Sequence, residues 1–177
     1  MIQVDNERAL HDYTFTFYLK EGFSLVQSSD FLGKDYDTKE VYIIDDQNHI
    51  IAIISPAWAR DAKGNKVNTY FTTNGNQLIQ HIDFDQNSIF PIVADPLFED
   101  IINSCAFAIA AFIGSTAFPI GKITKVKHFI QALGGLRAAV RAIKIAGGLA
   151  AAKRARGILG DLALELLGIA AIEHNCF

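Results

Sequence analysis

The chain lacks the sequence motifs of common enzymes and has few reactive residues. Its 177 residues include two cysteines, one methionine, one tryptophan and four prolines. Neither cysteine lies in a pattern typical of a nucleophile, and there is no phosphate-binding glycine loop, Gly-x-Ser-x-Gly elbow or His-Glu-x-x-His pair. We therefore expect no enzyme activity, no catalytic residue, no cofactor and no small-molecule substrate.

A secretion signal is also not visible at the start of the sequence. The segment MIQVDNERALHDY has neither a basic region nor an apolar core of the kind that a signal peptide needs. We expect a chain that is cytosolic, exported by another route, or a mature fragment.

Acidic residues are missing from a long stretch of the second half. No Asp or Glu occurs between Asp100 and Asp161. Residues 1–100 carry sixteen acids against seven Lys or Arg, whereas residues 101–177 carry three acids against nine. This asymmetry predicts two units, of which the cationic one faces an anionic partner or the acidic half itself.

Alternating apolar and polar residues mark the first half as β-structure. Residues 13–19, YTFTFYL, show the period-two pattern of a half-buried strand. The polar segment DDQNH separates β-branched runs at residues 41–44 and 50–54, which predicts a hairpin. Asn74-Gly75 suits the positive φ angles of a second hairpin. Roughly seven short strands fit before residue 93, which favours an antiparallel β-sandwich or rolled sheet.

The second half is predicted to be helical, with a sharp boundary. Asp95 can accept hydrogen bonds from the free amides of a first helical turn, and Pro96 suits the first helical position. We therefore predict an α+β fold. An acidic β-rich domain covers residues 1–95, and a cationic, Ala- and Gly-rich, all-helical domain covers residues 96–177.

Charge is absent from the run between Ile101 and Gly121. Within it, Ala106, Ala110 and Gly114 form a small-residue seam that allows a second helix to approach closely. As one continuous helix, the run is long enough to enter a bilayer as an insertion element. The alternative is a central helix that its neighbours bury on all sides.

Of the nine Lys and Arg residues in the acid-free interval, the last six follow the glycine pair Gly134-Gly135. The first three of these six recur at spacings of four and three, so they lie on neighbouring positions of one helix face. Such a face is either solvated, resting on the acidic half, or it meets phosphate headgroups while apolar side chains dip into lipid. Nucleic acid is disfavoured because the region has few aromatics and no recognised motif. The candidate lipid contacts are Arg137, Arg141, Lys144, Lys153, Arg154 and Arg156.

The two cysteines, Cys105 and Cys176, bracket the helical half. They are compatible with one disulfide that closes a loop of about seventy residues and stabilises the fold by roughly 4 kcal/mol. The alternative is a pair of buried free thiols.

Two clusters in the sequence combine aspartates with a histidine, which are residue types that bind metal ions. His81, Asp83 and Asp85 fall on one face of a predicted strand, where a metal site is geometrically possible. Strand alternation alone also places polar residues there, because apolar residues occupy the opposite face. The group formed by Asp45, Asp46 and His49 is typical of a turn. We expect no metal site.

Two motifs give the sequence a resemblance to a group of bacterial proteins. The segments AWARDAKG and PIVADP, at residues 57–64 and 91–96, precede an Ala- and Gly-rich tail that carries both cysteines. This layout resembles secreted proteins of Gram-positive bacteria, and it is similar to large, unmodified, geobacillin-26-like bacteriocins. The resemblance covers residues 10–177 and implies a secreted, non-enzymatic protein.

These observations lead to one hypothesis and its alternatives. The hypothesis is a secreted, bacteriocin-like antibacterial protein whose cationic helices bind anionic membrane lipid, with residues 101–121 as the insertion element. The acidic domain would keep the cationic helices in a soluble form. One alternative is a secreted or surface binding protein with a protein partner and a purely structural helical tail. Another is a toxin with an immunity protein, or a secretion-system effector.

Overall fold

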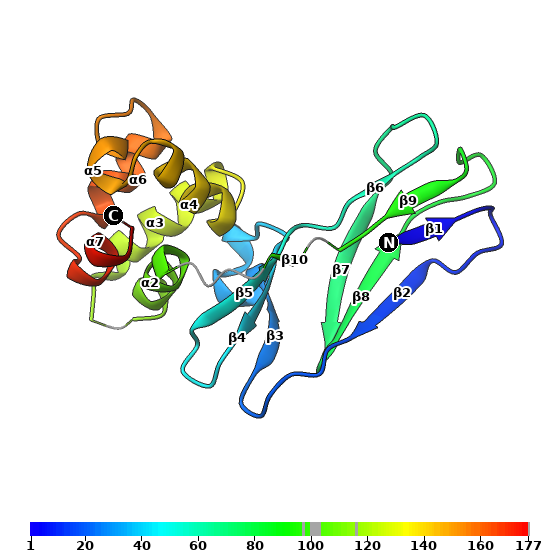
Figure 1. The fold of residues 1–177 in the computed structure, drawn as a ribbon, viewed down its shortest axis with the longest axis horizontal. Coiled ribbons are helices and arrows are strands. Elements are labelled where there is room, and N and C mark those ends of the chain that lie inside the picture. The colour runs from blue at the N-terminus through cyan, green and yellow to red at the C-terminus, as the bar shows by residue number, and fades with distance from the viewer. Residues whose placement is uncertain (97, 100–103, 116, 177) are drawn as a thin grey trace.

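The molecule is elongated, with helices at one end and strands at the other (Figure 1). The computed structural model describes residues 1–96, 98–99, 104–115 and 117–176. Helices α2 to α7 form a lobe, a four-stranded sheet lies in the middle, and two further sheets occupy the far end together with the N-terminus. The fold is α+β, with the strands first and a helical region last, as the sequence predicts.

Within the described residues, the strands form three small antiparallel sheets. The central sheet has the order β10-β5-β4-β3, the second β2-β8-β7 and the third β1-β9-β6. The strands are β1 Ile2–Val4, β2 Asp12–Thr16, β3 Ser24–Gln27, β4 Val41–Ile44, β5 Ile50–Ile54, β6 Ala59–Arg60, β7 Thr69–Asn74, β8 Gln77–Ile82, β9 Ile92–Ala94 and β10 Phe98–Glu99.

Both predicted hairpins are present. The β4–β5 hairpin has the predicted boundaries, and the Asp45 side chain accepts hydrogen bonds from the backbone amides of Gln47 and His49 in its turn. In the β7–β8 hairpin, Asn74 pairs with Gln77. The two-residue turn is therefore Gly75–Asn76, one residue later than predicted, and Gly75 has a φ angle of 57°.

The central sheet is covered on both faces. Tyr42, Ile44 and Ile53 pack into the largest hydrophobic cluster together with the helices. Val41 and Ile54 face the other way and pack against the second sheet. This explains the continuous apolar runs of β4 and β5, since a strand buried on two sides has no solvent-facing positions. The central sheet thus contributes to the core of the helical region, and independent folding of residues 1–95 and 96–177 stays a prediction.

The helical region consists of short helices joined by tight turns. Lys125 of α3 and Glu165 of α6 form an ion pair of 3.0 Å across its surface. A short helix and a 3-10 turn also lie between β3 and β4, where no helix was predicted. The elements are α1 Ser28–Phe31, η1 Lys34–Tyr36, α2 Ser104–Gly114, α3 Ile120–Ala132, α4 Leu136–Ile145, α5 Leu149–Ala152, α6 Ile158–Leu166 and α7 Ala170–Cys176.

The helix predicted over residues 101–121 is wrong in its extent. Residues 101–103 lie outside the described part of the chain, and α2 ends at Gly114. Pro119 does not end this helix but caps the start of α3, where its missing amide proton costs nothing. In the part of the chain that is described, no helix has both the length and the apolar character needed to cross a membrane.

The predicted helix start at Asp95 and Pro96 is also wrong. Phe98 and Glu99 form β10, which pairs with Ile54 and Ile53 of β5. The chain therefore adds an edge strand to the central sheet before it enters the helical region, because the edge of β5 offers unpaired backbone groups.

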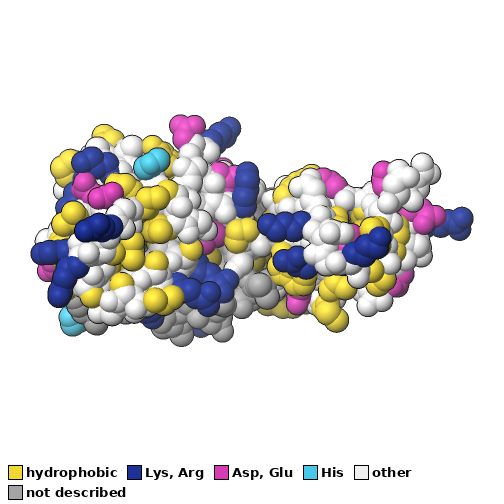
Figure 2. All heavy atoms as spheres, turned by 90° about the horizontal axis from the view of Figure 1, so that it is seen from above, with side chains coloured by type: hydrophobic (Ala, Val, Ile, Leu, Met, Phe, Trp, Pro, Cys, Tyr) yellow, Lys and Arg dark blue, Asp and Glu magenta, His cyan; other side chains and the backbone are white. Residues whose placement is uncertain are grey.

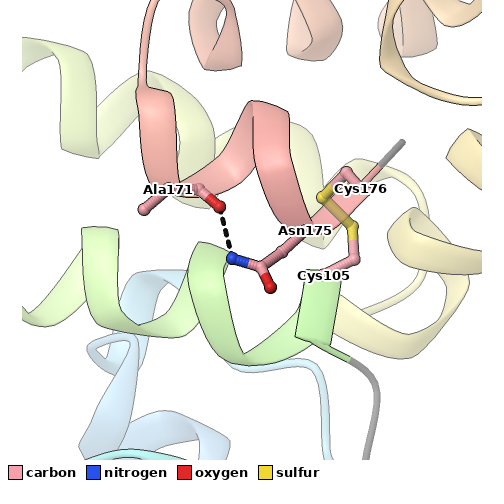
Figure 3. The surroundings of a disulfide bond; sticks show 4 residues. All are labelled: Cys105, Ala171, Asn175 and Cys176. Carbon is pink, nitrogen blue, oxygen red and sulfur yellow. Dashed lines mark hydrogen bonds between the residues drawn. A yellow bond between two sulfur atoms is a disulfide. The ribbon is translucent and has the colours of Figure 1, made fainter.

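The two cysteines form a disulfide, which confirms the predicted pairing. Cys105 lies in the first turn of α2 and Cys176 is the last residue of α7, 71 positions later (Figure 3). Beside it, the Asn175 side chain donates a hydrogen bond of 2.6 Å to the backbone carbonyl of Ala171. The bridge closes the helical region into one covalent loop.

Removing the disulfide should lower the free energy of unfolding by about 4 kcal/mol, because the bridge restricts the unfolded chain. Urea unfolding of the wild type and of the Cys105→Ser/Cys176→Ser variant measures this difference. Titration of thiols in the denatured, unreduced protein should find none. Two titratable thiols, or equal unfolding midpoints, would contradict the expectation.

Candidate functional site on helix α4

Helix α4 carries the first three candidate cations, and it begins without a capping side chain of its own. Its first residue follows Gly134 and Gly135, and no Asp or Glu lies in its first turn. Its buried residues recur at helical spacing, which turns one face to the core. The amides of the first turn have no partner within a helix, so an acceptor from elsewhere in the chain must satisfy them.

That acceptor is Glu40, which comes directly before β4. Its Oε2 atom accepts a hydrogen bond of 3.0 Å from the amide of Leu136, and its Oε1 atom accepts one of 3.3 Å from the amide of Arg137. The hydroxyls of Thr38 and Tyr42 each donate to Oε2 at 2.9 Å. A carboxylate is a favourable cap because it lies at the positive end of the helix dipole.

Glu40 is buried, with 2% of its surface exposed. Burial raises the pKa of its carboxyl group, and the hydrogen bonds from Tyr42, Thr38 and the two amides lower it, so that the pKa stays above the ordinary value. Burial also raises the pKa of the Tyr42 hydroxyl, and the nearby charge of Glu40 adds to this. Tyr42 therefore keeps its proton and donates a hydrogen bond to the carboxylate of Glu40.

Gly135 makes room for this contact. Its φ angle is 121°, in the range that side chains disfavour, and a Cβ atom there would lie 2.5 Å from Oε1 of Glu40. Gly134 has a φ angle of 91°, but the nearest atom to its Cβ position is 4.0 Å away, on Ala138. The approach of the carboxylate to the helix therefore requires glycine at position 135 for two separate reasons.

Arg137 faces the central sheet. Its guanidinium donates a hydrogen bond to the hydroxyl of Ser55, which follows β5 directly. Ser55 is buried. Because Val41 of β4 pairs with Ile54 of β5, Glu40 and Ser55 lie at the same end of the sheet. Arg137 is thus held by the acidic half of the chain, which is one of the alternatives that the sequence left open.

The other cations of α4 point to solvent. Arg141 and Lys144 are exposed, and neither makes an ion pair with any described residue. Next to them the side chain of Ile145 is 79% exposed. The exposed face of α4 therefore combines two unpaired positive charges with an apolar side chain.

The remaining three candidates, Lys153, Arg154 and Arg156, lie between α5 and α6 and are also exposed. None of them has an acidic partner among the residues that the structure describes. Figure 2 looks onto the upper side of the molecule, where hydrophobic side chains occupy the middle of the helical lobe and Lys and Arg side chains lie around them. Of the six candidates, five are thus presented to solvent, and Arg137 alone is engaged with the sheet.

Of the three residues in the small-residue seam of α2, two are buried and one is exposed. Ala106 and Ala110 are buried, and α2 packs against α7, β5, α3 and α4. Gly114 is exposed, and a Cβ atom there would have no neighbour within 4 Å. The two alanines therefore belong to the main hydrophobic core, and Gly114 does not.

The residues considered for metal binding are engaged in other contacts. Both ring nitrogens of His81 are occupied, with 2.7 Å to Asp12 and 2.7 Å to Thr72. Asp83 accepts a hydrogen bond from the side chain of Asn68, and Asp85 accepts hydrogen bonds from its own turn. Over the described residues, no three His, Cys, Asp or Glu side chains are grouped so that they could hold a metal ion.

The second cluster is a turn. His49 contacts Asp45 through Nδ1 at 2.9 Å, and its ring lies against that of Phe107, with 4.4 Å between centroids. Asp46 is exposed. These contacts fix the β4–β5 turn against α2, in agreement with the interpretation as turn residues.

Comparison with protein-family models, curated proteins and solved structures finds no match for this chain. The resemblance to secreted bacterial proteins therefore stays a prediction.

Glu40 and Ser55 were not among the residues that the sequence predicted for a site. A signal for a distant cap was nevertheless present, because α4 follows two glycines and lacks a Ser, Thr, Asp or Asn at its start. A helix that ends up buried without a local cap needs an acceptor from another segment. The sequence does not say which of the sixteen acids in residues 1–100 supplies it.

Gly135→Ala should destabilise the protein by about 3 kcal/mol or more, since the new Cβ meets the carboxylate and the φ angle is strained. Gly134→Ala is the matched control, because it carries the strained φ angle without the clash, and should cost about 1–2 kcal/mol. Chemical denaturation of both variants measures the difference. Equal losses would show that Glu40 does not approach position 135.

Glu40 should also make stability depend on pH. Its raised pKa means that the folded protein holds this proton more tightly than the unfolded chain does. The stability that it contributes below the unfolded pKa is therefore lost as the pH rises through the folded pKa. Glu40→Gln removes this titration and leaves every other ionisable group in place.

The free-energy gap, meaning the free energy of unfolding of the wild type minus that of Glu40→Gln, should accordingly fall as the pH rises from the ordinary pKa of a glutamate through the raised pKa of Glu40. Urea unfolding at a series of pH values measures it. A gap that is constant, or that grows with pH, would contradict a raised pKa in the folded state.

Proposed function

We propose that this protein is a secreted, bacteriocin-like, membrane-active protein that binds anionic membranes through the helical lobe. The observation that carries the proposal is the set of five exposed cations without acidic partners among the described residues, two of which share α4 with the exposed Ile145. Interfacial helices bind in this way, with apolar side chains in the lipid boundary and Lys and Arg at the phosphate groups.

The charge distribution supports a lipid surface over a purely solvated face. Like charges at spacings of three and four on one helix repel each other by a few tenths of a kcal/mol, and no acid in α4 offsets this. Arg137 does not take part in the first contact with lipid, because it is held against Ser55. The binding surface therefore consists of Arg141, Lys144 and the three cations between α5 and α6.

Insertion is proposed as a second step, carried by α2 and the uncharged residues that flank it. In the folded protein Ala106, Ile109 and Ala110 are buried, and the disulfide ties the start of α2 to α7. The helix must leave this core before it enters lipid. Its 11 residues span about 17 Å, roughly half of the hydrocarbon core, so insertion would draw on neighbouring residues as well.

A second candidate function is that of a secreted or surface protein that binds a protein partner through its strands. A pocket of about 600 Å³ favours it, lined among others by Trp58, Arg60 and Lys66. Tyr18 and Tyr70 are exposed in the same half of the chain. Exposed aromatic and arginine side chains are enriched at protein interfaces.

Reversal of the α4 charges tests the proposed function. Arg141→Glu/Lys144→Glu should reduce binding to phosphatidylglycerol vesicles at least about tenfold, because two attractions at the membrane become repulsions. Vesicle flotation measures binding, and dye release from the same vesicles measures insertion.

The matched control is Lys63→Glu/Lys66→Glu, which changes the net charge equally but lies in the exposed β6–β7 segment. This variant should bind like the wild type, and neither variant should alter binding to neutral vesicles. Wild-type protein that does not float with anionic vesicles would exclude the membrane-active function and leave the protein-binding alternative. Equal losses in both variants would show that net charge, and not this surface, attracts the protein.

A further inference from the structure

A pocket of about 420 Å³ lies between the end of β5 and the solvent-facing side of α4. Ser55 and Pro56 form its wall on the sheet side, and Arg137, Ala138, Arg141 and Ile145 are among the residues that line it on the helix side. The pocket therefore lies at the junction of the two halves of the chain, inside the surface proposed to meet lipid.

Two arginines line this pocket, and Arg141 is the one whose guanidinium is exposed. Arg137 is fixed in place by its hydrogen bond to the buried Ser55. Arg141, one helical turn later, is exposed and makes no hydrogen bond or ion pair with a described residue. A planar guanidinium can donate two parallel hydrogen bonds to a phosphate group, which is the reason that arginine is common in phosphate sites.

The remaining walls are apolar. Pro56, Ala138, Ala142 and Ile145 line the space next to the arginines, and Ile145 is the exposed residue of α4 described above. A ligand that contacts both the arginines and the apolar wall has one anionic group with an apolar portion attached to it. Inorganic phosphate would use the arginines and leave the apolar wall unused.

Glu40 also lines the pocket. Neither of its carboxylate oxygens lacks a hydrogen bond, so Glu40 does not compete with a bound anion for the arginines. Both of its carboxylate oxygens accept hydrogen bonds, from two amides of α4 and from the hydroxyls of Thr38 and Tyr42. The cap directs the positive end of the α4 dipole toward the carboxylate, which offsets part of its charge. The anionic occupant is thus drawn to the Arg141 side of the pocket.

We infer that this pocket binds the phosphate of a single phospholipid headgroup, with the glycerol and the first carbons of the acyl chains against Pro56, Ala138 and Ile145. The inference rests on the proposed membrane function and adds a defined stoichiometric site to it. A soluble lipid distinguishes the pocket from the membrane function. A defined site binds one lipid molecule in solution, whereas binding through a charged surface needs a membrane.

The experiment uses the full, disulfide-bonded chain and dihexanoyl phosphatidylglycerol below its micelle concentration. Isothermal titration calorimetry should give one site per chain and weaker binding of inorganic phosphate. Arg141→Gln should lower the affinity about tenfold, the loss expected for one charge-assisted contact. Lys63→Gln, which removes an exposed cation of the β6–β7 segment outside the pocket, should leave the affinity unchanged.

A second variant fills the pocket without changing charge. Ala138→Phe should abolish binding of the soluble lipid, whereas Ala150→Phe, at an exposed position of α5, should not. Thermal unfolding of each variant checks that it is folded. If Ala138→Phe does not fold, Arg141→Gln alone decides.

The outcomes separate the site from the function. No binding of the soluble lipid by a protein that still floats with vesicles would overturn the pocket and leave the membrane function standing. Equal affinity for inorganic phosphate would overturn it too, since the apolar wall would then contribute nothing. Binding of the soluble lipid without any binding to vesicles would keep the pocket and remove the membrane function.

Discussion

The contact between Glu40 and the start of α4 joins the two halves of this chain. One carboxylate satisfies two backbone amides that would otherwise be buried without partners, and each such loss costs about 1–3 kcal/mol. Burial of the carboxylate opposes ionisation, and hydrogen bonds from Thr38 and Tyr42 offset part of that cost. The geometry permits this only because position 135 has no side chain.

This contact also determines which cations remain available. With its first turn held against the sheet, α4 turns Arg137 toward Ser55 and leaves Arg141 and Lys144 in solvent. The acidic half thus engages one of the six candidate cations instead of covering all of them. The charge asymmetry of the sequence therefore survives as an asymmetry of the folded surface, and long-range attraction to an anionic partner remains possible.

Local patterns in the sequence were sufficient to predict much of the fold. The runs at residues 41–44 and 50–54 became β4 and β5 with the predicted boundaries, and the pairing of Cys105 and Cys176 is confirmed. The hairpin depends on residues that are neighbours in the sequence, and the disulfide depends on the only two cysteines of the chain. Of the predicted small-residue seam, Ala106 and Ala110 are buried and Gly114 is exposed.

The features that the sequence did not reveal depend on long-range contacts. Strand β10 exists because the edge of β5 is available, and α2 stops early because Pro119 starts another helix. Glu40 is separated from α4 by 96 positions, and no local pattern distinguishes it from other acids of the first half. The lining of the pocket beside Arg141 likewise comes from β5 and α4 together.

The bridge between Cys105 and Cys176 has a mechanical consequence. A force that pulls the chain from the C-terminal side of Cys176 passes across the sulfur–sulfur bond into Cys105 and continues toward the strands. Helices α3 to α6 lie outside that line of tension and carry no load. A translocase or protease that pulls from this side must therefore thread two chain segments side by side, or wait for a reductant.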